Sequence, residues 1–231
     1  MGAKPKGPAA IEASGLTKKY GDLVALAPLN LRIEPGERVC LIGSNGSGKT
    51  TFLRLVSGLL DKSEGNVTIF DDPAGSIDAR ARVSYLPDEP VLYDDLSVRE
   101  HLEYLGPLSG ASDWHERGEN LLKRLKLDHR GDDLPSGFSR GLRQKTSLAI
   151  GFLRPFDILL VDEPFVGLDE AGRKALLGLF EEAGERGATI VVASHQLDLL
   201  NWSNRCIALA EGEVTYDGAP GNVDLVKLVG A

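Results

Sequence analysis

The feature that most constrains the fold is a glycine-rich segment at residues 43–50, which reads Gly-Ser-Asn-Gly-Ser-Gly-Lys-Thr. It follows a short apolar run, Arg38–Ile42, and precedes residues 49–60, whose apolar side chains have helical spacing. A strand, a glycine loop and a helix in this order turn consecutive backbone N–H groups toward an anion at the start of the helix. The segment therefore predicts a phosphate-binding loop within an α/β fold.

Two side chains of this loop predict more than phosphate binding. Lys49 is placed to reach the β- and γ-phosphates of a nucleotide, and the hydroxyl of Thr50 to ligate Mg²⁺. A chance glycine turn is the alternative, but the flanking strand and helix disfavour it. The candidate nucleotide-binding residues of this region are Gly43, Ser44, Asn45, Gly46, Ser47, Gly48, Lys49, Thr50 and Thr51.

A second apolar run ends in two carboxylates. Residues 156–163 read Phe-Asp-Ile-Leu-Leu-Val-Asp-Glu, which predicts a strand at 157–161 with Asp162 and Glu163 at its carboxyl end, where open α/β sheets bind ligands. Because side chains alternate along a strand, the two carboxylates have different roles. Asp162 fits the Mg²⁺ shell, and Glu163 fits a base that polarises an attacking water. The alternative, an exposed turn after a core strand, is weakened by the phosphate loop.

The remaining periodicity predicts the architecture. The chain has 231 residues, which suits one compact domain. Helical spacing over about 97–153 predicts three helices: one that follows a capping box formed by Ser97 and Glu100, one at 114–127 and one at 139–153. The other segments predict a mostly parallel sheet with an antiparallel edge, built from strands at 11–42, 83–86, 157–161, 189–193, 205–209 and 214–216 and a helix at 170–186. Residues 1–10 are predicted to be a flexible leader.

Charge and composition exclude several classes of protein. The net charge is −8, from 26 Lys and Arg and 34 Asp and Glu, so we expect no broad basic surface and no nucleic-acid partner. No apolar stretch has the length of a membrane helix, and the start lacks the apolar core of a signal peptide. The prediction is a cytoplasmic protein. Cys40 and Cys206 lie in apolar runs, which favours two reduced core thiols over a disulfide.

Later motifs resemble the ATP-binding-cassette (ABC) family. Residues 138–145, Phe-Ser-Arg-Gly-Leu-Arg-Gln-Lys, resemble the ABC signature, whose common form is Leu-Ser-Gly-Gly-Gln. Residues 162–169 resemble the joined Walker B and D-loop, His195 the switch histidine, and Tyr20 the aromatic that stacks on adenine. The motifs occur in the family's order over about residues 11–220. The resemblance implies a P-loop NTPase core with an antiparallel β edge subdomain and an inserted α-helical signature lobe, in a single ABC ATPase domain at 11–231.

The resemblance also implies a mechanism and partners. The family's subunits bind ATP and Mg²⁺, and two of them sandwich two ATP molecules, with Ser139 and Gly141 meeting the γ-phosphate held by the opposite subunit. The expected partners are a transmembrane permease subunit and a second ABC ATPase subunit, on the inner face of the membrane. Catalytic roles fall to Glu163, His195 and Lys49. Taken alone, Ser139 is an ordinary N-cap, His195 a satisfied histidine and Tyr20 a strand-edge aromatic.

The chain departs from the family's pattern at three positions. Asp88 stands where the family usually has Gln; as a hard oxygen ligand, it keeps metal contact possible. Arg140 replaces the first Gly of the signature, and Leu142 replaces its Gln. Because Ser139 and Gly141 are kept, we still expect an active site. The variant motifs resemble those of bacterial exporter-type subunits whose membrane half is a separate chain.

Three other functions are weighed against this one. A soluble ABC ATPase not coupled to transport, for example of the iron–sulfur cluster assembly type, fits by size. A non-hydrolysing regulatory module is disfavoured by the intact Lys49, Asp162, Glu163 and His195. A small GTPase is disfavoured because the sequence has no Asn-Lys-x-Asp guanine-reading motif.

Overall fold

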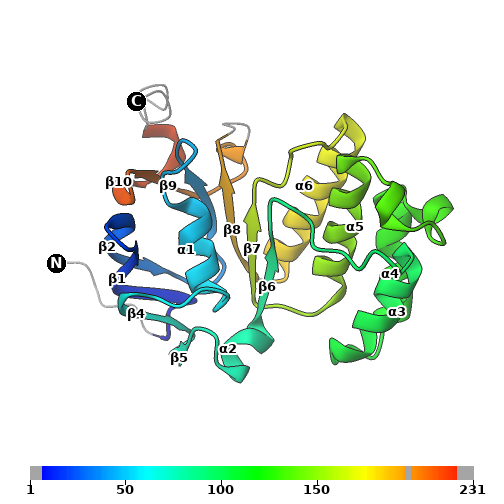
Figure 1. Cartoon of the computed structure of the whole chain (residues 1–231), viewed down its shortest axis with the longest axis horizontal. Coiled ribbons are helices and arrows are strands. Elements are labelled where there is room, and N and C mark those ends of the chain that lie inside the picture. Colours follow the sequence, from blue (N-terminus) through cyan, green and yellow to red (C-terminus); the bar gives the residue numbers. More distant parts are fainter. Residues whose placement is uncertain (1–6, 196–198, 223–231) are drawn as a thin grey trace.

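The computed structural model describes residues 7–195 and 199–222, and its secondary structure forms successive layers (Figure 1). A four-stranded sheet is followed by helix α1, then by a six-stranded sheet, and then by the remaining long helices. The α/β class, the antiparallel part and the helical lobe are all as the sequence predicts. The division into a leader (residues 1–10) and one domain stays a prediction, and residues 1–6 lie outside the described residues.

The six-stranded sheet is the centre of the molecule. Its order is β10-β9-β3-β8-β7-β6, and every neighbouring pair is parallel except β10 with β9. Its strands are β3 (Arg38–Ile42), β6 (Val83–Leu86), β7 (Ile158–Asp162), β8 (Thr189–Ser194), β9 (Arg205–Ala210) and β10 (Glu213–Gly218). The predicted parallel sheet is confirmed.

The inner strands β3, β7, β8 and β9 are buried on both faces of the sheet, which explains why they are nearly continuous apolar runs. Along β3, Cys40 and Ile42 pack against the helical side, whereas Val39 and Leu41 pack against α1 and the other sheet. The same alternation follows β7, β8 and β9, as the pleat requires. Cys40 and Cys206 are buried and free, and burial raises the pKa of Cys40 to about 12. The predicted core thiols are thus confirmed.

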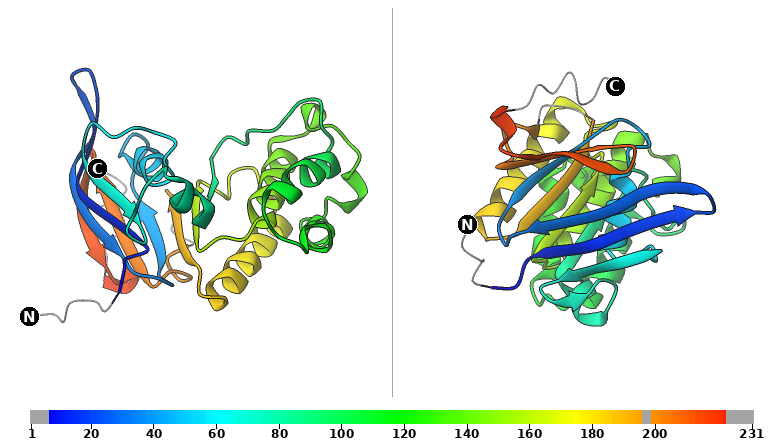
Figure 2. Two further views of the ribbon diagram at one scale, coloured as in Figure 1. Left: turned by 90° about the horizontal axis from the view of Figure 1, so that it is seen from below. Right: turned by 90° about the vertical axis from the view of Figure 1, so that its left-hand side faces the viewer.

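The four-stranded sheet is antiparallel, with the order β2-β1-β4-β5. Its strands are β1 (Ile11–Tyr20), β2 (Leu23–Ile33), β4 (Glu64–Ile69) and β5 (Asp72–Pro73). Figure 2 shows the β1–β2 hairpin extending beyond the body of the core, at the end opposite the helical lobe. The sequence analysis predicted β1 and β2 but missed β4, β5 and the short helix α2 (Ile77–Arg82).

The helical lobe consists of α3 (Val98–Leu108), α4 (Trp114–Arg124) and α5 (Arg140–Leu153), while α6 (Glu170–Glu185) covers the central sheet. The predicted capping box is present, because Ser97 and Glu100 exchange side-chain to backbone hydrogen bonds. Helices α3, α4 and α5 are the three predicted within 97–153, but α4 ends before the predicted 127. Lys126 has a φ of 57° and ends α4, and two 3-10 turns, one beginning at Pro135, fill the stretch before α5.

Helix α1 (Lys49–Val56) is shorter than the predicted 49–60. Gly58 has a φ of 73°, a left-handed conformation that terminates helices. A Cβ atom added at Gly58 would lie 2.3 Å from the Cα of Gly75, so the chain needs glycine there to pack closely. The sequence pattern overestimated this helix because apolar residues continue beyond the point where the backbone turns.

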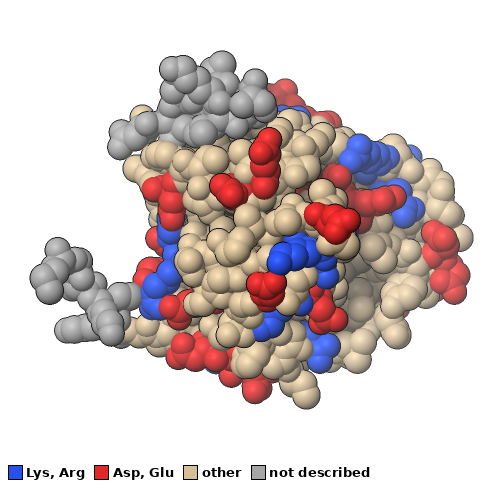
Figure 3. All heavy atoms as spheres, turned by 60° about the vertical axis from the view of Figure 1, so that its left-hand side comes forward, with Lys and Arg blue, Asp and Glu red and all other residues tan. Residues whose placement is uncertain are grey.

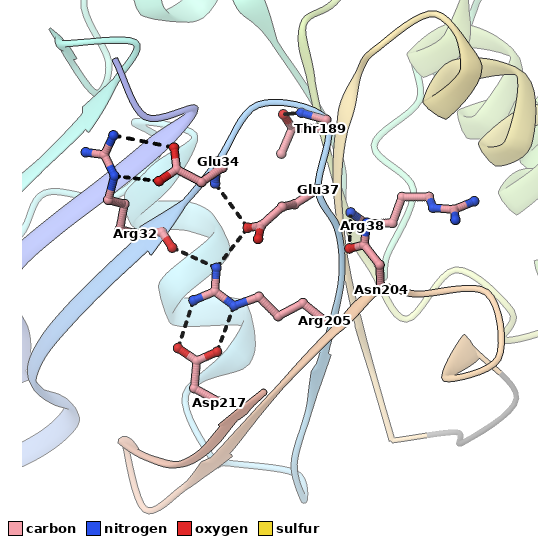
Figure 4. Close-up of polar contacts among 9 residues, drawn as sticks. Arg32, Glu34, Glu37, Arg38, Thr189, Asn204, Arg205 and Asp217 are labelled. Atoms are coloured by element: carbon pink, nitrogen blue, oxygen red, sulfur yellow. Dashed lines mark hydrogen bonds and ion pairs between the residues drawn. The ribbon is translucent and has the colours of Figure 1, made fainter. Parts of the chain in front are cut away.

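An ion-pair network closes the amino end of the central sheet (Figure 4). Arg205, at the start of β9, donates to both carboxylate oxygens of Asp217, at 2.7 and 2.8 Å, and to Glu37 at 2.8 Å. It also donates to the backbone oxygen of Arg32 on β2, at 2.8 Å. The Arg205 side chain is 19% exposed, and these anionic partners raise its pKa. One guanidinium thus joins β2, β9, β10 and the turn before β3.

Lys and Arg side chains are interspersed with Asp and Glu on the face drawn in Figure 3. This mixture agrees with the expectation that the chain presents no broad basic surface there. Across residues 7–195 and 199–222, no helix has both the length and the apolar content needed to cross a membrane.

Candidate active site

The phosphate loop (residues 43–50) connects the end of β3 to the start of α1. It lies so close to neighbouring backbone that glycine is required. A Cβ atom at Gly43 would lie 2.4 Å from the oxygen of Leu209, and one at Gly48 would lie 3.0 Å from the oxygen of Ala25. Gly48 also has a φ of 106° and is the N-cap of α1. The loop therefore has the geometry that the motif predicts, with its glycines set by packing as well as by backbone rotation.

The β9–β10 turn holds the loop from behind. The amide of Gly212 donates to the backbone oxygen of Ser47 at 3.0 Å, and the oxygen of Gly212 accepts from the amide of Ala27 at 3.0 Å. One residue near the end of the chain therefore joins the phosphate loop to β2 of the antiparallel sheet. The sequence predicts the strands on either side of this turn, at 205–209 and 214–216, but not this contact.

Lys49 lies inside the loop and is only 5% exposed. Its Nζ donates to the backbone oxygens of Gly43 at 2.7 Å and Ser44 at 3.0 Å, and lies 4.0 Å from Oε1 of Glu163. Burial lowers the pKa of Lys49, while the carboxylates of Glu163 and Asp162 act in the opposite direction. The amine is thus held where it can exchange backbone partners for phosphate oxygens.

Asp162, at the end of β7, is a buried carboxylate with an exposure of 1%. Neither oxygen completes a hydrogen bond with any described residue. Burial raises the pKa of Asp162, the nearby Thr50 hydroxyl lowers it, and the charges of Glu163 and Asp88 raise it. A carboxylate beside a hydroxyl offers the hard oxygen atoms that suit Mg²⁺. Among the residues described, no three His, Cys, Asp or Glu side chains form a metal cluster, so such an ion would also need phosphate and water oxygens.

Glu163 has a φ of 45°, a left-handed conformation that is strained for a residue with a side chain. Its amide donates to the oxygen of Ala193 on β8, at 2.9 Å, which holds this conformation in place. Oε1 accepts from the amide of His195 at 3.1 Å, and Oε2 lies 3.0 Å from Nδ1 of that histidine. The hydroxyl of Ser194 also donates to Oε2, at 3.3 Å. The carboxylate is therefore oriented by the end of β8, as a general base needs to be.

A cavity of about 510 Å³ lies beside Thr50 and Asp162. Thr50, Asp88 and Asp162 are among the residues that line it. The three residues predicted to hold metal come from α1, the loop after β6 and β7, and the fold brings them to the same cavity. Their roles as metal ligands stay a prediction.

The signature residues lie at the exposed start of α5. Ser139 is its N-cap, and its hydroxyl accepts from the amide of Leu142 at 3.3 Å. A Cβ atom at Gly141 would lie 2.3 Å from the oxygen of Gly167, so this glycine lets α5 pack against the loop after β7. Arg140, between them, forms an ion pair of 3.0 Å with Asp88. This pair connects the helical lobe to a residue of the cavity.

Two further residues extend the site. Asp169 caps α6 by accepting from the amide of Gly172 at 2.9 Å, and also pairs at 3.0 Å with Lys145 on α5. Tyr20 ends β1, is 51% exposed and lies under Nζ of Lys18, which is 4.9 Å from the ring centroid. It belongs to the hairpin whose other strand contacts Gly48. Its role in binding adenine stays a prediction.

Comparisons with known proteins agree with this geometry. The family model described as "ABC transporter" matches residues 26–166. The ABC-type transporter ATP-binding protein EcsA of Bacillus subtilis (strain 168) is 34% identical over 216 residues, which cover 90% of this chain and 86% of EcsA.

Two solved structures have the same fold. The ATP-binding subunit of an ABC transporter superposes with a TM-score of 0.86 at 30% identity, covering 91% of this chain and 90% of its own. A dimeric ATP-binding cassette in a post-hydrolysis state, with ADP and phosphate bound, gives a TM-score of 0.81 at 25% identity, covering 91% of this chain and 98% of its own. On its sequence, its fold and the arrangement of its site, the chain belongs to the ABC transporter family and is an ATP-binding, ATP-hydrolysing cassette.

Proposed function

We propose that this cassette powers transport by a separate membrane-spanning partner, and that two cassettes close on ATP in each cycle. The observation that carries the proposal is the ion pair between Arg140 and Asp88. Because Asp88 lines the cavity with Thr50 and Asp162, this contact brings the exposed N-terminus of α5 next to the phosphate site. One chain thus presents both a phosphate loop and an exposed helix start with a free dipole end.

A two-fold pair of cassettes would use both elements. In a symmetric dimer, each surface meets the same surface of its partner, so Ser139 and Gly141 of one copy face the phosphate loop of the other. The hydroxyl and amide groups at the start of α5 would then bind the γ-phosphate. The dimer seen in the related solved cassette supports this arrangement. Closure depends on ATP because these contacts need the γ-phosphate.

Within one site, each residue has a proposed task. Lys49 and the loop amides bind the phosphates, and Glu163, oriented by His195, accepts a proton from the attacking water. Mg²⁺, held by Thr50 and Asp162 with Asp88 beside them, would neutralise phosphate charge when bound. Tyr20 stacks on the adenine ring.

The membrane partner is proposed to dock near the loop after β6. Val91, Tyr93 and Tyr104 are exposed apolar or aromatic side chains on this loop and on α3, with exposures of 87, 51 and 54%. Such a group of exposed apolar side chains is typical of a protein contact. The exporter direction remains part of the proposal, on the variant motifs alone.

The test of dimer closure uses Glu163→Gln, which should bind ATP and hydrolyse it slowly. With Mg-ATP, size-exclusion chromatography with light scattering should give twice the monomer mass, and with ADP the monomer mass. Adding Ser139→Arg should abolish the dimer while ATP still binds. A Glu163→Gln protein that stays monomeric with saturating ATP would contradict the proposal.

The test of the membrane partner is purification of the wild-type chain from its native membrane after mild cross-linking. We expect a companion with several apolar helices, and its recovery should fall for Val91→Asp/Tyr104→Asp. Companions with no membrane-spanning segment would favour the alternative, an ABC ATPase not coupled to transport.

A further inference from the structure

Two positions at which this chain departs from the family's usual residues contact each other. Asp88 and Arg140 are 52 residues apart in the sequence, and Nη2 of Arg140 donates to Oδ1 of Asp88 at 3.0 Å. One residue follows β6, and the other begins α5 in the helical lobe. A neutral residue at each position has been replaced by a charged one, and the two charges have opposite signs.

The pair does not serve mainly to stabilise the fold. The side chains are 58% and 47% exposed, and an ion pair with such exposure contributes little to stability. Arg140 also occupies the first turn of α5, which contains no acidic residue, and a cation at a helix N-terminus is unfavourable. The position of Arg140 therefore has a local cost that its contact with Asp88 offsets.

The charge of Asp88 acts on the phosphate site. Asp88 lines the same cavity as Thr50 and Asp162. The lining of this cavity includes four carboxylates, against two guanidinium groups: Asp88, Glu89, Asp94 and Asp162, with Arg54 and Arg143. Without a partner, Asp88 would repel a triphosphate.

We propose that Arg140 is a positioning residue that offsets the charge of Asp88, so that the pair presents no net charge to phosphates bound in the cavity. This inference rests on the proposed function, in which the cavity adjoins the phosphates of ATP. It adds that the first residue of the signature helix sets the electrostatics of the phosphate site in its own chain.

Removing one or the other charge of the pair should change the affinity for ATP in opposite directions. Arg140→Gln leaves Asp88 unpaired and should weaken ATP binding about 2- to 5-fold. Asp88→Asn leaves Arg140 unpaired and, in the absence of Mg²⁺, should make ATP binding tighter, because a carboxylate is removed from the cavity. The double variant Asp88→Asn/Arg140→Gln should return to the wild-type dissociation constant, because no net charge is again present.

The experiment measures the ATP dissociation constant by calorimetry in EDTA, so that any contact of Asp88 with Mg²⁺ does not contribute, for the full-length protein at two salt concentrations. The Arg140→Gln defect should shrink at about 0.5 M salt, where charges are screened beyond a few ångströms. The matched control is Glu181→Gln, which removes an exposed charge on α6 outside this cavity and should not rescue Arg140→Gln. Melting temperatures should be the same for all variants to within a few degrees.

Three outcomes would overturn the inference while wild-type protein still binds ATP. They are an Arg140→Gln protein that binds like wild type, a double variant as weak as Arg140→Gln, and a defect insensitive to salt. A double variant as weak as the single one would mean that Arg140 acts directly on a nucleotide, including one held by a second copy. Wild-type protein that binds no ATP would instead contradict the proposed function.

Discussion

The two ends of the central sheet are built for different purposes. At the amino ends of its strands, Arg205 has partners for its guanidinium in Glu37, Asp217 and a backbone oxygen, and Asn204 accepts from the amide of Arg38. At the carboxyl ends, Asp162 has no hydrogen bond to a described residue, and Glu163 has a strained backbone. The same strands therefore join an end whose charged groups are paired to an end where the buried Asp162 carboxylate has no hydrogen bond within the described part of the chain.

The largest effect should come from the carboxyl end. Glu163→Gln removes the proposed base and should lower the ATP turnover number by about 10²- to 10⁴-fold, with the ATP dissociation constant nearly unchanged. Steady-state phosphate release checks the first value, and calorimetry the second. Glu181→Gln, on the exposed face of α6, should hydrolyse ATP like wild type. If Glu163→Gln turned over normally, the carboxyl end would lose its catalytic base.

Lys49→Ala should weaken ATP binding by about 10- to 100-fold, because a charged hydrogen-bond donor to phosphate is lost. Calorimetry without Mg²⁺ measures this effect on its own. Lys174→Ala, which removes an exposed cation from α6, is the control and should bind ATP normally. Equal ATP binding by Lys49→Ala and wild type would show that the loop amides suffice.

The amino end should respond in stability rather than activity. Arg205→Met leaves Glu37 and Asp217 without their shared cation and should lower the free energy of unfolding by about 2–4 kcal/mol. Urea denaturation measures this, and turnover per folded molecule should be preserved. Arg130→Ala, which breaks a pair between two half-exposed side chains, should cost less than about 1 kcal/mol. Loss of turnover in folded Arg205→Met would break the contrast between the ends.

The smallest effect should have the opposite sign. Asp162→Asn removes a buried charge without a hydrogen bond and should raise the free energy of unfolding of the nucleotide-free protein by about 1 kcal/mol. Folding raises the pKa of Asp162, so as pH falls the native wild-type protein takes up a proton before the unfolded chain does. The gain in the free energy of unfolding from Asp162→Asn should therefore be full above the folded pKa. It should be lost as pH falls from the folded pKa to the unfolded pKa.

Urea denaturation over a pH series checks this prediction. With Mg-ATP, wild type should become more stable than Asp162→Asn, because the Asp162 carboxylate would gain a bound cation and the amide of the variant would gain less from it. If Asp162→Asn destabilised the nucleotide-free protein at neutral pH, Asp162 would have a structural partner instead of a role reserved for a ligand.

Much of the site was predictable because its residues are local in sequence. The strand before the phosphate loop and the strand before Asp162 are continuous apolar runs. Within each motif, the functional residues are separated by a fixed number of positions, so one residue locates the others. The segment that contains β4, β5 and α2 was missed because its elements are short and interrupted by turns, with positive φ at Phe70, Asp71 and Gly75. Their pairing depends on β1, which lies far away in the sequence.

Side-chain contacts between distant parts of the chain could not be predicted from the sequence. Asp88 and Arg140 were each identified as departures, but no pattern indicates that they meet across 52 residues. The strain at Glu163 and its two contacts with His195 also follow from the way β7 and β8 align. These features arise only when separate elements pack.

The contact of Gly212 with the phosphate loop limits where the chain can accept insertions. Because Gly212 is hydrogen-bonded both to Ser47 and to Ala27, the turn between β9 and β10 cannot be lengthened without moving the phosphate loop. Insertions, tags or new chain ends are therefore tolerated at other surface turns sooner than here. A reporter peptide inserted beside Gly212 should therefore change the affinity for ATP, although this turn is far from the phosphate loop in the sequence.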